Sequence, residues 1–291
     1  YFVNIPLELS KQLQQSALTN LTVNSSVGMR SKSIFFRNTD NLEVLNFIQS
    51  LKSSKSSDKY DLNSIVIKSI GPMIVNHLTF LFNKCIEEGV FPQCLKNSKT
   101  IAMYKKGDKN CCNSYRPISI LPVFSKIFEN IIKIRMVDFL ESNNLFAKEQ
   151  FGFRKGLSTT IAMMDLLDEI HTNNENRLIT QATLLDLSKA FDCVPHDRLL
   201  DKLYRYGIRG LSLDLIRSYF QNRWQCVVEK GKFSSKERIT IGVPQGSILG
   251  PLFFLLYIND LPTNVPSKGK ILFADDTTLL DAAKTIEDVN Y

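Results

Sequence analysis

Two adjacent aspartates stand inside an otherwise apolar stretch near the end of the chain, and this pair limits the possible folds more than any other feature. Asp275 and Asp276 directly follow the short apolar run of residues 271–274. An unpaired ionised carboxylate is expensive to bury, and two neighbouring carboxylates repel each other unless a cation lies between them. Carboxylate oxygens are also hard ligands that suit Mg²⁺. The pair therefore predicts a strand hairpin over residues 271–280 that turns at a metal site.

A third aspartate, Asp186, closes another predicted strand. Residues 180–187 are mostly apolar or β-branched, and Asp186 stands near their end. A single aspartate after a strand is more often a turn residue or a helix cap, so Asp186 alone carries little weight. Together with Asp275 and Asp276, it predicts a site where strand ends bring carboxylates together.

The charge of the chain favours an anionic partner. Its 291 residues include 36 Lys and Arg against 29 Asp and Glu, which gives a net charge of +7. Nucleic acid is the leading partner for such a chain, although many basic proteins simply carry solvated lysines. The hydrophobic share of 44% and charged share of 22% are typical of a globular protein. The length suits one large domain or two modest ones.

The cysteines and the absence of sorting signals favour an intracellular setting. The six cysteines show no CxxC pair and no zinc-ligand spacing, as expected for reduced thiols. No signal peptide and no apolar run long enough to span a bilayer are visible, so the sequons at Asn20 and Asn24 carry no weight. Because the chain begins at Tyr1 rather than Met, we expect an excerpt of a longer protein. We expect it in the nucleus and/or the cytoplasm, not secreted, with no membrane partner and with its oligomeric state open.

Hydrophobic periodicity predicts an α+β fold, in which a short antiparallel sheet is backed by helices and preceded by a helical and stranded subdomain. Residues 1–37 are polar and weakly patterned, as in a lead-in or linker. Caps are predicted at Asp40 with Glu43, at Gly89 and at Ser158. Predicted helices are 40–48, a hairpin with arms 62–70 and 72–88, 122–140, 158–171, 196–206, 211–220 and 248–261. Predicted strands are 100–104, 116–121, 180–187, 224–229, 238–243 and the hairpin at 271–280.

Several segments resemble reverse transcriptase motifs and occur in the order of that family. Residues 185–192, 242–247 and 273–276 resemble motifs A, B and C. Upstream, residues 105–108 and 115–119 are similar to the finger motifs, and residues 149–154 to a segment that non-LTR elements carry before motif A. Over roughly residues 38–284 the chain is identified as a member of the reverse transcriptases of non-LTR (LINE/jockey-like) retrotransposons.

The resemblance implies a right-hand polymerase with fingers and palm subdomains, the palm being an antiparallel sheet backed by helices. It implies fingers and N-terminal helices over residues 38–175, and a palm with motifs A, B and C over 176–291 that stops before the thumb. The implied activity is RNA-directed DNA synthesis, with an RNA template, a DNA primer and dNTPs as partners. An intron- or retron-type enzyme, or a truncated or domesticated relative that binds nucleic acid without catalysis, are the alternatives. With no thumb and no upstream endonuclease in this chain, the activity of the fragment alone stays open.

The resemblance also implies roles for the carboxylates. Asp186 and Asp275 would bridge two Mg²⁺ ions, with Mn²⁺ as a substitute, and the backbone carbonyl of Leu187 would complete one ligand shell. Asp276 would assist less directly, and a plain turn residue is its alternative reading.

Further residues are implied to bind the nucleotide. Arg116 would grip the triphosphate, because a planar guanidinium pairs bidentately with phosphate oxygens, and Lys105 or Lys106 would add a second positive charge. Phe191 would pack under the sugar and exclude a 2′-hydroxyl, unless it is simply a core phenylalanine. Gln245 and Gly246 would lie against the nascent base pair.

Overall fold

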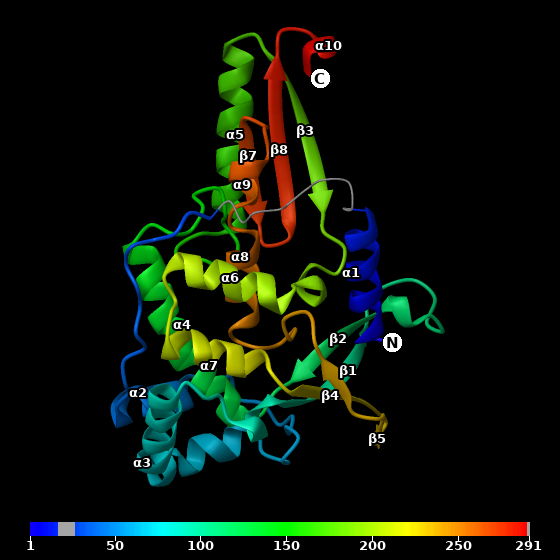
Figure 1. Ribbon diagram of the computed structural model, residues 1–291. Helices are drawn as coiled ribbons and strands as arrows, with labels where there is room; N and C mark the ends of the chain where they lie inside the picture. The colour runs from blue at the N-terminus through cyan, green and yellow to red at the C-terminus, as the bar shows by residue number, and fades with distance from the viewer. Residues whose placement is uncertain (17–26, 290–291) are drawn as a thin grey trace.

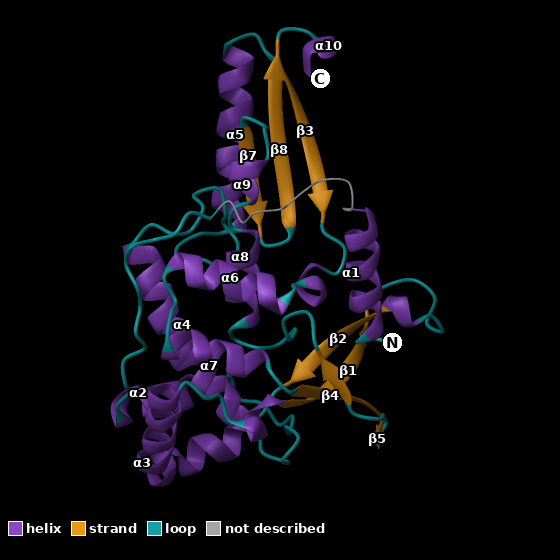
Figure 2. Ribbon diagram, in the orientation of Figure 1, coloured by secondary structure: helices purple, strands orange, loops and turns teal. Residues whose placement is uncertain are grey.

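Two separate sheets and a layer of helices make up the computed structural model, which describes residues 1–16 and 27–289 (Figure 1). A three-stranded sheet projects at the top of the view beside α5, and a five-stranded sheet lies at the lower right (Figure 2). The helices are α1 Asn4–Ser16, α2 Asn41–Ser50, α3 Ser64–Glu88, α4 Val123–Ser142, α5 Thr159–Glu175, α6 His196–Tyr206, α7 Leu211–Phe220, α8 Gly250–Ile258, α9 Leu261–Asn264 and α10 Ile286–Val289. Short 3-10 turns are η1 Gln93–Lys96, η2 Cys112–Ser114 and η3 Ala190–Cys193.

The three-stranded sheet is antiparallel and carries the predicted aspartates. Its order is β3-β8-β7, formed by β3 Ile179–Asp186, β7 Gly269–Phe273 and β8 Asp276–Ala283. The predicted strand over 180–187 and the predicted hairpin over 271–280 are therefore confirmed. α5 packs against β3 and β7. The register pairs Asp186 with Asp276, so the end of β3 and the start of β8 lie side by side.

The five-stranded sheet is mixed, not purely antiparallel. Its strands are β1 Asn97–Tyr104, β2 Tyr115–Ile120, β4 Arg223–Glu229, β5 Lys232–Phe233 and β6 Glu237–Ile239. β1 pairs antiparallel with β2 but parallel with β4. The sheet thus joins strands from both sides of the boundary predicted between residues 175 and 176.

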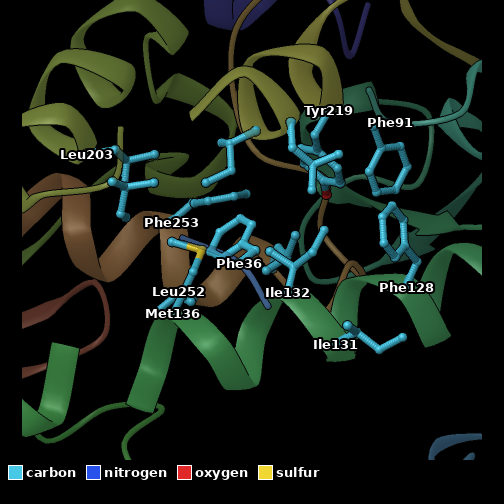
Figure 3. Close-up of a cluster of buried hydrophobic side chains, with 14 of the residues drawn as sticks. Phe36, Phe91, Phe128, Ile131, Ile132, Met136, Leu203, Tyr219, Leu252 and Phe253 are labelled. Atoms are coloured by element: carbon cyan, nitrogen blue, oxygen red, sulfur yellow. The ribbon is translucent and has the colours of Figure 1, made fainter. Parts of the chain in front are cut away.

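The helices between the sheets share an aromatic core (Figure 3). Phe128 of α4 stacks on Phe91 with ring centroids 5.2 Å apart, and Phe91 meets Tyr219 of α7 edge-on at 5.0 Å. Ile127, Ile131 and other residues at three-and-four spacing in α4 are fully buried. The helix predicted over 122–140 is confirmed, with one face buried.

The predicted break between two helical arms at Pro72 is wrong. α3 runs without interruption from Ser64 to Glu88 with Pro72 inside it. A proline leaves the carbonyl four residues earlier without its helical partner. Here that carbonyl belongs to Lys68 and accepts a hydrogen bond from Gln49 Nε2 of α2 at 3.3 Å. The caps at Asp40, Gly89 and Ser158 are confirmed.

α3 also corrects the expectation that no segment is long enough to span a bilayer. By length and composition alone, it is the one helix of the described residues that meets that requirement. Ile67, Val75 and Phe82 on one side of it are buried in the core. α3 packs against α2, α4 and α7.

Three further expectations differ from the structure. The predicted lead-in contains α1, which packs against η3, whereas Asn20 and Asn24 lie outside the described residues. The strand predicted over 238–243 ends at Ile239, because Gly242 and Val243 donate instead to the carbonyls of Val194 and Phe191. The helix predicted over 248–261 is divided into α8 and α9.

Candidate active site

A tight turn joins β7 to β8, and we call residues 274–276 the carboxylate turn. Phe273 and Asp276 are partners in the ladder, so Ala274 and Asp275 alone reverse the chain. Ala274 has φ +58°, in the left-handed region that alanine seldom adopts. The backbone therefore presents Asp275 at the tip of the hairpin.

One cavity of about 620 Å³ gathers residues from both sheets and from the segments between them. Asp186 and Asp275 line it from the three-stranded sheet, and Lys105 and Arg116 line it from the region of the five-stranded sheet. The other predicted site residues in its lining are Leu187, Phe191, Gln245 and Gly246. Residues far apart in sequence, predicted to act together, therefore face one space.

Two predicted residues do not line this cavity. Lys106 is exposed beside Lys105, and Asp276 is exposed at the start of β8. Asp276 is the direct ladder partner of Asp186, which places their side chains on the same face of the sheet. Asp275 lies in the turn and Asp276 in β8, and of these two adjacent aspartates only Asp275 lines the cavity.

The expected cluster of three carboxylates is not formed. Across residues 1–16 and 27–289, no group of three or more His, Cys, Asp or Glu side chains is arranged to hold a metal ion. The side chains of Asp186, Asp275 and Asp276 have no hydrogen bond or ion pair within these ranges. Mg²⁺ in polymerase-type sites is typically held by one or two carboxylates, waters and substrate phosphates. Two unpartnered carboxylates on one cavity fit that kind of binding.

A second segment that lines the cavity is residues 242–247, which we call the glutamine loop. Gln245 Nε2 donates to Asp192 Oδ1 at 2.8 Å, and its backbone carbonyl accepts from Ser119 N at 2.8 Å. Burial raises the pKa of Asp192, while the hydrogen bond from Gln245 and the nearby Lys189 lower it. Hydrogen bonds thus hold both the side chain and the backbone of Gln245.

Gly246 allows this loop to touch β2. It has φ +114°, and a Cβ at this position would lie 2.5 Å from the Ser119 carbonyl oxygen. Only glycine fits both the conformation and the approach. Gln245 of this loop and Arg116 of β2 both line the cavity.

A buried polar group supports the loop from behind. Glu129 Oε2 of α4 accepts from the backbone N–H groups of Ile248 and Leu249, just before α8. Burial raises the pKa of Glu129, and the neighbouring Arg223 opposes that shift.

Arg223 is 1% exposed, and its Nε and Nη2 have no hydrogen-bond partner among the described residues. Burial, aided by Arg223, lowers the pKa of Lys96 to about 8.

Phe191 faces the cavity and also packs on the core. Its ring stacks on Phe254 of α8 with centroids 4.6 Å apart and meets Phe153 edge-on at 6.3 Å. Phe153 lines the same cavity. The packing fixes the plane of the Phe191 ring. This is compatible both with a ring that packs under the sugar and with a core phenylalanine.

His196 supports the glutamine loop at Gly242. Its Nε2 donates to the Gly242 carbonyl at 2.7 Å, and burial lowers its pKa. Sequence reasoning missed the supporting roles of Asp192, Glu129 and Gln150, although Asp192 and Gln150 lie inside motif-like segments. It also missed Tyr1, Phe2 and Pro6, which line the cavity from the N-terminal segment without any sequence signal.

Comparison with known proteins decides the family. Residues 103–288 match the family described as reverse transcriptase (RNA-dependent DNA polymerase). The chain belongs to the reverse transcriptase family. The match begins in β1 and ends in α10, so this reverse transcriptase region includes both the carboxylate turn and the glutamine loop.

Relatives of this reverse transcriptase come from mobile elements. It is 31% identical to the probable RNA-directed DNA polymerase from transposon X-element of Drosophila melanogaster, over 86% of this chain and 29% of the relative. It is 32% identical to the RNA-directed DNA polymerase from mobile element jockey of the same species, over 84% of this chain and 27% of the relative. The expected kinship with non-LTR elements is confirmed, and the chain spans less than a third of each relative.

Proposed function

We propose that this chain is the polymerase portion of a non-LTR retrotransposon protein and copies RNA into DNA. The observation that carries the proposal is the shared cavity, which is lined by Asp186 and Asp275 from the strand ends and also by Lys105 and Arg116. Acidic and basic side chains that line one cavity suit a nucleoside triphosphate bound with a divalent cation.

In this proposal the three-stranded sheet with α5 serves as the palm, and β1 with β2 belongs to the fingers. The predicted division into a lead-in over 1–37, fingers over 38–175 and palm over 176–291 stays a proposal. So does the intracellular location, nuclear and/or cytoplasmic, for which the six free thiols are suitable.

Asp186, Asp275 and the Leu187 carbonyl would hold Mg²⁺, with Asp276 assisting from the neighbouring position. Such a cation neutralises charge on the attacking and leaving oxygens of phosphoryl transfer. Arg116 and Lys105 would orient the triphosphate so that its α-phosphate meets the primer 3′-hydroxyl. Phe191 would close the space beside the sugar 2′ carbon, and Gln245 with Gly246 would contact the new base pair.

Primer extension tests the proposal directly. The purified chain should extend oligo(dT) on poly(rA) with dTTP when Mg²⁺ is present and should make no product with a chelator. Binding of the template-primer should be measured in parallel by fluorescence anisotropy. Tight binding without extension would instead favour the non-catalytic nucleic-acid-binding relative, and the polymerase proposal for this chain would fail.

A further inference from the structure

A buried glutamine, Gln150, grips the carboxylate turn from behind. It is 2% exposed, and its Oε1 accepts hydrogen bonds from Ala274 N at 3.0 Å and from Gly152 N at 2.8 Å. Its Nε2 lies 3.5 Å from the Ala274 carbonyl oxygen, a weaker contact. The amide therefore faces both backbone polar groups of the residue immediately before Asp275.

Ala274 needs such support because of its backbone conformation. An L-residue with a Cβ is disfavoured in the left-handed region, where Ala274 lies with φ +58°. A residue persists in that region only where its surroundings determine the conformation. The Gln150 amide satisfies the Ala274 N–H in this shape, so the contact favours the turn that presents Asp275.

The segment that carries Gln150 is itself firmly anchored. Backbone hydrogen bonds join Phe151 N to the Leu272 carbonyl at 2.8 Å and Leu272 N to the Glu149 carbonyl at 2.9 Å. Arg154 pairs with Glu141 of α4 at 3.0 Å. The turn is therefore bonded, through Gln150, to a segment that is itself anchored on α4.

The approach of this segment depends on a glycine. A Cβ on Gly152 would lie 2.3 Å from Ala274 N, closer than any side chain allows. Gly152 and Gln150 therefore both lie directly against the backbone of Ala274.

We propose that Gln150 is a positioning residue that holds the carboxylate turn in the conformation from which Asp275 faces the cavity. This inference rests on the proposed polymerase function. It assigns Gln150 no contact with substrate, and its effect passes through Ala274 to Asp275.

The test compares Gln150→Met in two backgrounds. In the natural background, Gln150→Met should lower kcat for primer extension by about tenfold to a hundredfold, because small displacements of reacting groups cost that much. KM for dTTP should change less than about threefold, since no nucleotide contact is lost. With Ala274→Gly, the same change should cost clearly less, because glycine adopts the left-handed conformation without support.

Gln181→Met is the matched control. Gln181 lies on β3, is exposed and pairs with Asp281, away from the turn. It should leave kcat unchanged. Hydrogen–deuterium exchange adds a readout that needs no activity: in Gln150→Met the amides of Gly152 and Ala274 should exchange faster, while those of residues 278–280 stay protected.

The outcomes separate the two proposals. An equal loss of kcat in both backgrounds, a loss confined to KM, or unchanged exchange at Gly152 and Ala274 would each overturn the positioning role. If the unaltered chain makes no DNA, the proposed function fails, and the exchange rates still decide whether Gln150 holds the turn.

Discussion

The carboxylate turn and the glutamine loop face the same cavity but are held in opposite ways. In the turn, the backbone is fixed by ladder pairing and by Gln150, while the Asp275 carboxylate has no partner among residues 1–16 and 27–289. In the loop, the side chain of Gln245 is itself bound by Asp192. A ligand for a cation must keep its oxygens available, whereas a side chain that contacts a base pair gains from a fixed orientation. The difference is therefore consistent with the proposed roles, metal binding for the carboxylate turn and base-pair contact for the glutamine loop.

Replacing the two adjacent aspartates one at a time gives the largest expected effect and tests the role of the carboxylate turn. Asp275→Asn should lower primer extension by about a thousandfold or more, because losing a cation's ligand charge removes several kcal/mol of transition-state stabilisation. Asp276→Asn, outside the cavity lining, should cost about tenfold or less. Steady-state extension rates measure both, and template-primer affinity should stay within about threefold.

Equal losses in the two variants would break the comparison. They would mean that Asp276 moves into the cavity when substrate binds, and that the unequal placement seen here has no catalytic meaning. Full activity of Asp275→Asn would remove the metal assignment altogether.

Removing the support behind the glutamine loop should give the next largest effect. Glu129→Ala leaves the N–H groups of Ile248 and Leu249 without their acceptor, and should lower the free energy of unfolding by about 3 kcal/mol. Glu129→Gln keeps one acceptor oxygen and should cost about 1 kcal/mol. Urea denaturation measures both, and KM for dTTP should rise in the alanine variant as the loop loosens.

An alanine variant as stable as the parent would contradict this account. The loop would then owe its shape to its other hydrogen bonds, including those with Asp192 and Ser119.

Replacing Phe191 tests how the cavity distinguishes deoxynucleotides from ribonucleotides. Phe191→Ala should lower the preference for dTTP over UTP by about tenfold or more, because the ring no longer fills the space beside the 2′ carbon. The ratio of kcat/KM for the two nucleotides is the measurement. Phe233→Ala removes an exposed ring of β5 that does not line the cavity, and it serves as the control. Unchanged selectivity in Phe191→Ala would leave Phe191 as a core residue that stacks on Phe254.

The carboxylates and the residues that support the two turns also differ in how far the sequence could predict them. Asp186 and Asp275 were found because strand periodicity is local and a carboxylate at the end of an apolar run stands out. Gln150 was missed as a support because its partner, Ala274, lies 124 positions away, and an amide carries no signal of what it will bind. The same holds for Glu129, which sits within an otherwise regular helix pattern.

The break predicted at Pro72 failed for a related reason. Proline disrupts a helix through a lost hydrogen bond, and Gln49 of another helix supplies the replacement. The unequal placement of Asp275 and Asp276 could not be predicted either, because sequence shows which acids follow strands but not which of two adjacent side chains lines the cavity.

The smallest expected effect concerns the buried charges behind the glutamine loop. Lys96 lies beside Arg223, and burial together with Arg223 lowers its pKa from 10.5 to about 8. Below pH 8 the fold therefore holds a charged ammonium at a cost in stability. Between pH 8 and 10.5 the unfolded chain keeps a proton that the folded chain has released, so stability from this group rises with pH.

Lys96→Met should accordingly stabilise the protein by about 1 kcal/mol at pH 7, after the loss of its hydrogen bond to Ser218 is counted. The gap should close as pH rises toward 10.5, as followed by urea denaturation at a series of pH values. Lys106→Met, at an exposed site, should stay within about 0.5 kcal/mol of the parent throughout. A destabilised Lys96→Met would mean that the buried cations strengthen the fold. A stabilised one would mean that the fold keeps a costly buried charge at Lys96, whereas Asp186 and Asp276 carry their charges at exposed positions.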